Sequence, residues 1–337
     1  MRQSKWVQVA ALGLALSLSG CGSVSLSDVR KPDFQAGASR RAGSGAQVLR
    51  GHAEAVRAVA VSPDGRTLAS AGADGVIMLW DAATGDRQRV LEDRMGAVWA
   101  LAYSPDGSML ASGSQDGLLR LWDTRSFQVL TSVNKPNGGA LAVVFAAGDG
   151  IASVGDDGHL RWRDPRTAAT RDVLSVGEDA LTALDVSPDG GRLVTGDWNG
   201  TLKLWDLKQG RPLATFAGRA DSITSVAFSP DGRLMAASSG DRRVVLYDTQ
   251  TYQVVRTLAG LNGNRHQVRF SPDGRLLATG GSDKVVHLWE VDTGAPVGRF
   301  GGHQGAITSL AFHPSRRQVI TGSTDATVRV WDLSAAR

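Results

Sequence analysis

The sequence predicts an all-β fold: a seven-bladed β-propeller of four-stranded antiparallel blades, closed by an N-terminal strand that completes the last blade. Short apolar runs of strand length alternate with turn motifs, and the 41 glycines of the 337 residues cluster in those turns. A landmark pair, aromatic-acidic in six of its seven copies, recurs every 41 or 42 residues, a period typical of propeller blades. Its seven copies are Trp80-Asp81, Trp122-Asp123, Arg163-Asp164, Trp205-Asp206, Tyr247-Asp248, Trp289-Glu290 and Trp331-Asp332.

Residues 1–20 are typical of an export signal. A basic start is followed by the apolar run 6–18, which is too short to span a bilayer as a helix. The next residues, Leu18-Ser19-Gly20-Cys21, resemble the lipobox of bacterial lipoproteins. That resemblance implies that Cys21, the one cysteine of the sequence, is acylated and anchors the protein. Gly22-Ser23 then fits outer-membrane, periplasm-facing placement; the alternative is a plain signal peptide with a chance cysteine.

Three further segments follow the signal. Residues 21–46 hold the cysteine and a stretch rich in Gly, Ser and Ala without apolar periodicity, which predicts a flexible linker. Residues 47–333 contain the repeats and form the expected propeller domain, and residues 334–337 are a C-terminal tail. An array of repeats counts as one domain at this length.

Within the repeats, each unit reads as four strands in order. A first run such as Val56 to Val61 leads into a turn, most often Ser-Pro-Asp-Gly, where Pro and Gly suit the dihedral angles of a type I turn. A second strand, an Asp-Gly turn, a third strand ending in the landmark and a fourth strand complete the unit. We interpret the turn carboxylates as turn residues rather than metal ligands, because each loop offers one.

Charge and motifs exclude several classes. Removing Arg2 and Lys5 with the signal leaves 35 of the 37 basic residues against 33 acidic ones, and no aromatic residues alternate with the basic pairs. Nucleic acid is therefore not an expected partner. The six histidines show no metal-ligand spacing, and no nucleophile elbow, phosphate loop or HExxH motif occurs. We expect no catalytic residues, no metal and no cofactor.

The repeat resembles the WD40 family in its Gly-His start, Ser/Thr in the second strand, turn Asp and closing Trp-Asp, over residues 47–333. The resemblance implies a buried hydrogen-bonded tetrad of His, Ser/Thr, Asp and Trp in each complete blade. Two sets are complete: His52, Ser70, Asp74, Trp80, and His303, Thr321, Asp325, Trp331. The central copies lack the His, so their stability is expected to rest more on apolar packing.

The resemblance also implies how the ring closes. The chain stops soon after the third strand of the seventh copy, while Gln47 to Arg50 precede the first Gly-His as an orphan strand. We expect this strand to become the fourth strand of the last blade, leaving no long free edge in a monomeric propeller.

In such propellers the starts of the first strands and the turns between second and third strands share one face, the usual partner-binding surface. Trp99 and Trp198 are the notable pair there, because neither belongs to the landmark series and exposed Trp is a frequent hot spot. The alternative is that each packs between blades. Trp162 fits the core, and His266 is a possible ligand. The candidate binding residues are Arg57, Trp99, Gln115, Asp156, Trp198 and His266. The equivalent positions of the other repeats hold Leu141, Thr182, Thr224, Thr308 and Ser282.

Three functions remain open at the level of sequence. The first is a non-catalytic interaction scaffold, lipid-anchored in the cell envelope, that binds an envelope protein or peptide. The second is binding or processing of a small molecule or cell-wall glycan in the central channel, which convergent carboxylates in the channel would favour. The third is a structural envelope lipoprotein without a dedicated partner.

Overall fold

A computed structural model describes residues 40–41, 45–92, 96–134, 139–146, 150–216, 221–258, 261–264 and 266–335. The chain divides into two units, 1–35 and 36–337, and every described residue belongs to the second. The expected signal peptide, Cys21 and the linker up to residue 39 lie outside the described residues. Within the described part, no helix is both long and apolar enough to cross a membrane.

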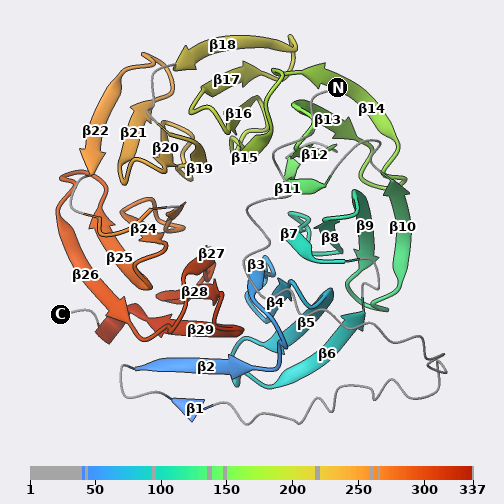
Figure 1. Cartoon of the computed structure of the whole chain (residues 1–337), viewed down its shortest axis with the longest axis vertical. Helices are drawn as coiled ribbons and strands as arrows, with labels where there is room; N and C mark the ends of the chain where they lie inside the picture. The colour runs from blue at the N-terminus through green and yellow to red at the C-terminus, as the bar shows by residue number, and fades with distance from the viewer. Residues whose placement is uncertain are drawn as a thin grey trace, which may run out of the picture. The chain divides into compact units, whose positions relative to one another are not determined.

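Seven antiparallel sheets are arranged in a ring, which confirms the predicted seven-bladed propeller (Figure 1). In each blade the first strand lies nearest the centre of the ring and the fourth lies at its periphery. Blade 1 contains β3 (Val56–Val61), β4 (Thr67–Gly72), β5 (Val76–Asp81) and β6 (Arg87–Glu92). Blade 2 contains β7 (Val98–Tyr103), β8 (Met109–Ser114), β9 (Leu118–Asp123) and β10 (Val129–Asn134). Blade 3 contains β11 (Ala140–Ala146), β12 (Gly150–Gly155), β13 (His159–Arg163) and β14 (Thr170–Ser175).

The remaining blades follow the same order. Blade 4 contains β15 (Leu181–Val186), β16 (Arg192–Asp197), β17 (Leu202–Asp206) and β18 (Arg211–Phe216). Blade 5 contains β19 (Ile223–Phe228), β20 (Leu234–Ser239), β21 (Val244–Asp248) and β22 (Val254–Leu258). Blade 6 contains β23 (Gln267–Phe270), β24 (Leu276–Gly280), β25 (Val285–Glu290) and β26 (Pro296–Gly301). Blade 7 contains β27 (Ile307–Phe312), β28 (Gln318–Ser323) and β29 (Thr327–Asp332), followed by a short 3₁₀ helix (Leu333–Ala335).

The fourth strand of blade 7 comes from the other end of the domain. Strand β2 (Ala46–Arg50) pairs antiparallel with β29, with Leu49 opposite Val328. A two-residue strand, β1 (Arg40–Arg41), pairs with β2 and makes this sheet five-stranded. Strand β1 and the buried Ala46 both fall in the stretch expected to be a linker, so part of that stretch is ordered against the ring.

The core fills the spaces between neighbouring blades. One cluster joins blades 1 and 2 through side chains such as Ile77 and Trp122, and another joins blades 4 and 5 through Leu204 and Met235. Because neighbouring blades cover both faces of each sheet, the strands inside a blade are apolar on both sides rather than strictly alternating. Trp162 is partly buried and packs against the cluster between blades 3 and 4.

The two complete tetrads stand in blades 1 and 7, one on each side of the closure. In blade 7 the His303 ring lies 2.9 Å from an Asp325 oxygen through Nδ1 and 2.7 Å from the Thr321 hydroxyl through Nε2. The Trp331 indole donates to the same hydroxyl at 2.8 Å. Blade 1 repeats this arrangement with contacts of 2.9, 2.8 and 2.8 Å among His52, Asp74, Ser70 and Trp80. Each tetrad therefore links four segments of one blade through buried polar contacts.

Two of the blades without the His use another partner for the turn Asp. In blade 3 the Asp157 carboxylate accepts a hydrogen bond from Arg161 at 2.6 Å, and in blade 6 Asp283 lies 2.7 Å from His287 Nε2. Both partners are four residues beyond the Asp, on the third strand of the same blade. The expectation that these blades rest mainly on apolar packing is therefore incomplete, because a local polar contact replaces part of the tetrad.

Arg163 takes the place of the landmark Trp in blade 3. The side chain is 1% exposed, and its Nε donates to the Ser153 hydroxyl at 3.4 Å, as the indole nitrogens do elsewhere. Its Nη1 donates to the Ala168 carbonyl and the Thr170 hydroxyl. Burial lowers the pKa of Arg163, and repulsion from Arg161 adds to this. A cation thus occupies the site of an indole with neutral acceptors as its hydrogen-bond partners.

Replacing this residue by the consensus one, Arg163→Trp, is expected to stabilise the protein by about 1–2 kcal/mol, because a buried cation is removed and the bond to Ser153 is kept. Urea denaturation measures the change in the free energy of unfolding. Arg163→Leu is the matched control: it also removes the charge, but leaves the Ser153 hydroxyl without a donor and is expected to gain less. A variant Arg163→Trp less stable than wild type would show that the guanidinium contacts outweigh the cost of burying the charge.

Lowering the pH from 7.5 to 5 is expected to destabilise the propeller. Burial lowers the pKa of His266, His303 and His313 in the folded protein. The unfolded chain takes up protons below its ordinary histidine pKa of about 6.5, whereas the folded protein resists, so stability falls with pH. Each histidine contributes up to about 1.4 kcal/mol per pH unit in this window. Asp185, whose pKa burial raises, acts in the opposite sense.

Urea midpoints measured at pH 7.5, 6.5, 5.5 and 5.0 check this expectation. The decline is expected to begin near pH 6.5, where the histidines of the unfolded chain take up protons. The carboxylates with lowered pKa values, such as Asp74, contribute only at lower pH, because they titrate below their ordinary pKa of 3.8. A midpoint that stays constant from pH 7.5 to 5 would contradict it.

Candidate partner-binding face

One face of the ring carries both groups of candidate residues. In blades 1, 2, 4, 5 and 7 the residue at the turn between the second and third strands donates its backbone N–H to the carbonyl of the residue that precedes the first strand, for example Gln115 to Ala97 at 2.9 Å and Trp198 to Ala180 at 3.0 Å. The starts of the first strands and the turns between second and third strands therefore lie side by side. We call this surface the rim face.

Arg57 and Trp99 meet on the rim face at the boundary of blades 1 and 2. The Arg57 guanidinium carbon lies 4.8 Å from the centre of the Trp99 ring, within the range of a cation–π interaction. Both side chains are partly buried, and each belongs to the second residue of an inner strand, Arg57 in β3 and Trp99 in β7. The contact holds the indole in one orientation, so a partner would meet a preorganised pair rather than a free tryptophan.

Trp198 lies on the same face in blade 4 and is 41% exposed. It begins the turn between β16 and β17, where Asp197 Oδ1 accepts the backbone N–H of Asn199 at 3.0 Å and of Thr201 at 2.7 Å. These bonds fix the turn while the indole faces solvent. A large aromatic side chain left exposed on a rigid turn is typical of an interaction site.

Exposed acidic residues share the rim face with Trp198. Asp156 of blade 3 is exposed at the neighbouring turn, and Glu178 and Asp179 are exposed before the first strand of blade 4. Asn199 donates to Asp179 at 2.6 Å, which ties that loop to the tryptophan's turn. Gln115 is also exposed. The candidates Gln115, Asp156 and Trp198 are thus accessible.

Other candidates on this face have structural contacts. The Thr182 hydroxyl donates to the Ile223 carbonyl of the next blade at 2.6 Å, and Thr224 donates to the His266 carbonyl at 3.0 Å. Thr308 does the same to Val56, across the closure. These hydroxyls join neighbouring inner strands. The sequence does not reveal this role, because it depends on which blades are neighbours in the ring. Leu141 is partly buried, and Ser282 bonds Asn264 at 2.8 Å.

The position of the His266 side chain differs from what is expected of a partner-binding residue. Its side chain is 1% exposed and its ring lies edge-on to His287, with 6.4 Å between centroids. Burial lowers the pKa of His266, although the charge of Asp283 opposes the shift. The position belongs to the rim face by its place in the strand, but the ring points into blade 6 and does not offer itself to a partner.

The central channel carries one charged pair. Asp185 of β15 and Arg269 of β23 occupy equivalent positions on inner strands two blades apart, and they attract each other electrostatically. Asp185 accepts the backbone N–H of Phe228 at 2.7 Å, and Arg269 donates to the Val268 carbonyl at 2.7 Å. Asp185 is the one carboxylate within the seven inner strands. No group of three potential metal ligands occurs among the described residues.

Comparison with known proteins shows related sequences. The model of the WD domain, G-beta repeat, matches residues 43–81, 85–123, 172–206, 210–248, 253–290 and 294–332, together about two thirds of the chain. The unmatched stretch between 123 and 172 contains Arg163 and most of blade 3. Its sheet nevertheless has the same four strands as the other blades, because apolar strand pattern and turns persist where the landmark is lost.

Among curated relatives, the ribosome biogenesis protein ENP2 of Chaetomium thermophilum is 35% identical over 100 residues, 26% of this chain and 15% of the relative. The small ribosomal subunit protein RACK1 of Medicago sativa is 62% identical over 39 residues, 12% of each chain. Protein Mut11 of Chlamydomonas reinhardtii is also 62% identical over 39 residues, 12% of this chain and 10% of the relative. The matches span 15% or less of the relatives' length: about one repeat for RACK1 and Mut11, and somewhat more than two for ENP2. With its matched repeats and its propeller fold, the chain belongs to the WD40 repeat family.

Proposed function

We propose that the protein is a non-catalytic interaction scaffold that binds a protein or peptide on the rim face, between the Arg57–Trp99 pair and Trp198. The exposed Trp198 indole on a rigid turn carries the proposal. Tryptophan and arginine are enriched among residues that dominate binding energy, and exposed ones gather at interaction surfaces. Two aromatic anchors on one face suit an extended macromolecular partner better than a small ligand.

The channel supports this choice over binding of a small molecule or glycan. Asp185 stands alone as an inner-strand carboxylate, and Arg269 partly neutralises it. Convergent carboxylates, which would favour a glycan or catalytic site in the channel, are therefore not assembled on the described inner strands. The names of two relatives, a small ribosomal subunit protein and a ribosome biogenesis protein, are consistent with propellers that work among other macromolecules.

We also propose that Cys21 is acylated and holds the propeller at the outer membrane, facing the periplasm. The support is the sequence alone: the apolar run, the Leu18-Ser19-Gly20-Cys21 tetrapeptide and Gly22-Ser23. Membrane fractionation with metabolic labelling by a fatty acid tests this proposal. Wild type should carry label and sediment with outer membranes, and Cys21→Ala should lose both. An unlabelled, soluble wild-type protein would refute the anchor.

The partner proposal is tested by crosslinking in intact cells, followed by binding measurements with each captured protein. Trp198→Ala is expected to weaken binding by about 30-fold, about 2 kcal/mol, as for a central hot spot. The double variant Trp99→Ala, Trp198→Ala should lose capture altogether. Val254→Ala is the control, because Val254 is also an exposed apolar residue, 57% against 41% for Trp198, but lies on the outer strand β22.

Thermal unfolding of each variant shows whether it still folds. Equal binding by wild type and the folded Trp198→Ala variant would refute the assignment of the face. If neither version captures a protein while a small ligand or glycan binds the purified domain, the channel alternative replaces the scaffold.

A further inference from the structure

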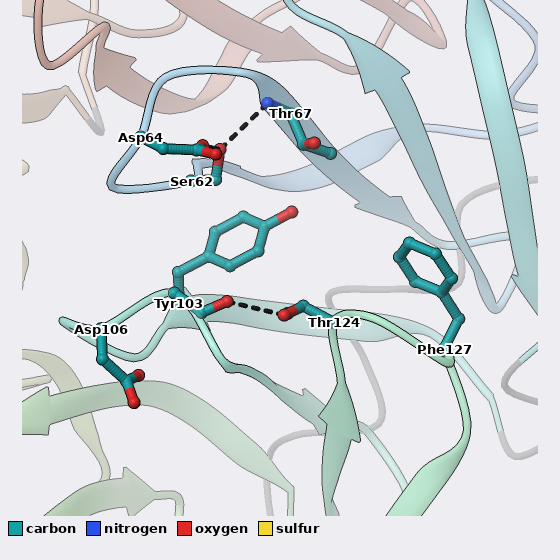
Figure 2. Close-up of a pocket in the computed structure, with 8 residues that line it drawn as sticks. Ser62, Asp64, Thr67, Tyr103, Asp106, Thr124 and Phe127 are labelled. Atoms are coloured by element: carbon teal, nitrogen blue, oxygen red, sulfur yellow. Dashed lines mark hydrogen bonds between the residues drawn. The ribbon is translucent and has the colours of Figure 1, made fainter.

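A cavity of about 180 Å³ opens between blades 1 and 2 (Figure 2). Its lining includes Asp64, Thr67, Tyr103, Asp106, Thr124 and Phe127. These residues come from the turns after the first strands and from the ends of the third strands. In an antiparallel blade those ends lie opposite the starts of the first strands, so the cavity faces away from the rim face.

The boundary between blades 4 and 5 has the same construction, shifted by 125 residues along the sequence. Asp64 corresponds to Asp189, Thr124 to Thr249 and Phe127 to Tyr252, and the turn hydrogen bonds of Asp64 and Asp189 are alike. One position differs in size and charge: Thr67 stands where blade 4 has Arg192. The Arg192 guanidinium crosses the boundary and donates to the Thr249 carbonyl at 2.8 Å.

Other boundaries are filled as well. Between blades 7 and 1, Arg316 donates to the carbonyl of Ala82, the equivalent of Thr249, at 3.0 Å. Between blades 5 and 6, Leu234 packs against the cluster that contains Val291, and between blades 6 and 7, Leu276 packs against the cluster of Leu333. Thr67 is too short to reach across, and the cavity is the space it leaves.

The groups around this space suit a cation. The Thr124 carbonyl, equivalent to the two carbonyls that accept from Arg192 and Arg316, has no hydrogen-bond donor among the described residues. Asp64 lines the cavity and supplies negative charge, with the exposed Arg66 Nε 4.0 Å from its Oδ2. Asp106 also belongs to the lining, but its carboxylate points away from the space in Figure 2. Figure 2 shows the Tyr103 hydroxyl directed into the space between Thr67 and Phe127. Burial raises the pKa of Tyr103, and the negative charge of Asp64 adds to this.

Phe127 is the aromatic residue of the lining at the end of blade 2. Its backbone is left-handed, with φ of 60°, as is that of the equivalent Tyr252 with φ of 62°, where blades 1, 4 and 6 place Gly85, Gly210 and Gly294. A bulky residue in this conformation costs about 1 kcal/mol, so the ring is kept at this place against a backbone preference. Arg89 stacks on the ring at 4.6 Å, which shows that the aromatic face accepts a guanidinium.

We propose that this cavity binds a guanidinium group that comes from outside the domain, either the arginine side chain of a protein partner or a small guanidino compound. The group takes the place that Arg192 fills between blades 4 and 5. It donates to the Thr124 carbonyl, lies beside Asp64 and packs against Phe127. The site is independent of the rim face, so either assignment can fail without the other.

The test is titration calorimetry of the purified propeller with L-argininamide, compared with L-citrullinamide, its uncharged urea isostere. Argininamide is expected to bind saturably, with a dissociation constant on the order of 1 mM, and at least fivefold more tightly than citrullinamide. Thr67→Arg, which supplies the side chain that blade 4 carries, should weaken argininamide binding at least tenfold. Thr215→Arg adds the same charge on the exposed face of β18 and should leave binding unchanged.

A second pair of variants covers the case in which Thr67→Arg fails to fold. Asp64→Asn should weaken binding at least threefold, whereas Asp231→Asn, the same turn position at the leucine-filled boundary of blades 5 and 6, should have no effect. Equal binding of the two amides, or binding unaffected by both Thr67→Arg and Asp64→Asn, would overturn the proposal. The peptide acetyl-Ala-Arg-Ala-amide then separates the sources: tighter binding than argininamide favours a protein arginine, and weaker binding favours a small compound.

Discussion

Leu49→Asp in strand β2 is expected to lower the free energy of unfolding by about 4 kcal/mol or more and the melting temperature by about 8 °C or more. Leu49 is 1% exposed and faces the blade opposite Val328. The substitution removes a buried apolar side chain and places an unpaired carboxylate there. The ring then loses the strand through which its two ends join, so the effect reaches beyond one contact.

Leu91→Asp is the matched control. Leu91 occupies the same register position in β6, opposite Ile77, but β6 directly follows β5 of its own blade along the chain. Differential scanning calorimetry gives both melting temperatures, and limited proteolysis follows residues 45–50. The Leu49 variant should expose those residues to the protease, whereas the Leu91 variant should not. An unchanged melting temperature for Leu49→Asp would show that β2 contributes nothing to the folded ring in solution.

The blade count could be predicted from the sequence because its signal is local and periodic. Turn residues, strand-length apolar runs and the landmark each depend on neighbours within a few residues, so their spacing survives where one of them changes. Arg163 illustrates this: the period placed it at a Trp position, and the structure gives it the same bond to Ser153. The local substitutes for the missing His, such as the bond of Arg161 to Asp157 four residues before it, are not part of the repeat pattern, so the pattern does not predict them.

Contacts between blades could not be predicted in the same way. The role of Thr182 depends on a carbonyl 41 residues away, and that of Thr308 on one 252 residues away. The burial of His266 follows from packing against His287 in the same blade, which its place at a strand start does not reveal. The cavity beside Thr67 depends on a side chain being short where the equivalent residues are long, and that comparison has meaning only once the boundaries are superimposed. Sequence periodicity thus specifies blades, whereas their boundaries need coordinates.

Trp331→Ala is expected to cost about 3–5 kcal/mol, which would leave a large share of the molecules unfolded near 37 °C. The indole is fully buried, lies 5.9 Å from the Phe300 ring and 5.8 Å from the His303 ring between centroids, and belongs to the cluster that also contains Ala46 of β2. Its removal opens a cavity between the closing strand and blade 6. The Thr321 hydroxyl also loses its indole donor.

Trp331→Phe separates packing from the hydrogen bond. It keeps most of the ring volume and removes the indole N–H, so it should cost about 1–2 kcal/mol. Trp289→Phe is the matched control in blade 6, where the indole donates to Thr279 at 3.2 Å without a His in the network. If the tetrad is cooperative, the loss measured by urea denaturation is larger at Trp331 than at Trp289, because weakening one bond also weakens the contact of His303 with Thr321. Equal losses would mean that the indole bond is worth the same with or without the His, and that the complete tetrads beside the closure add no cooperative stabilisation.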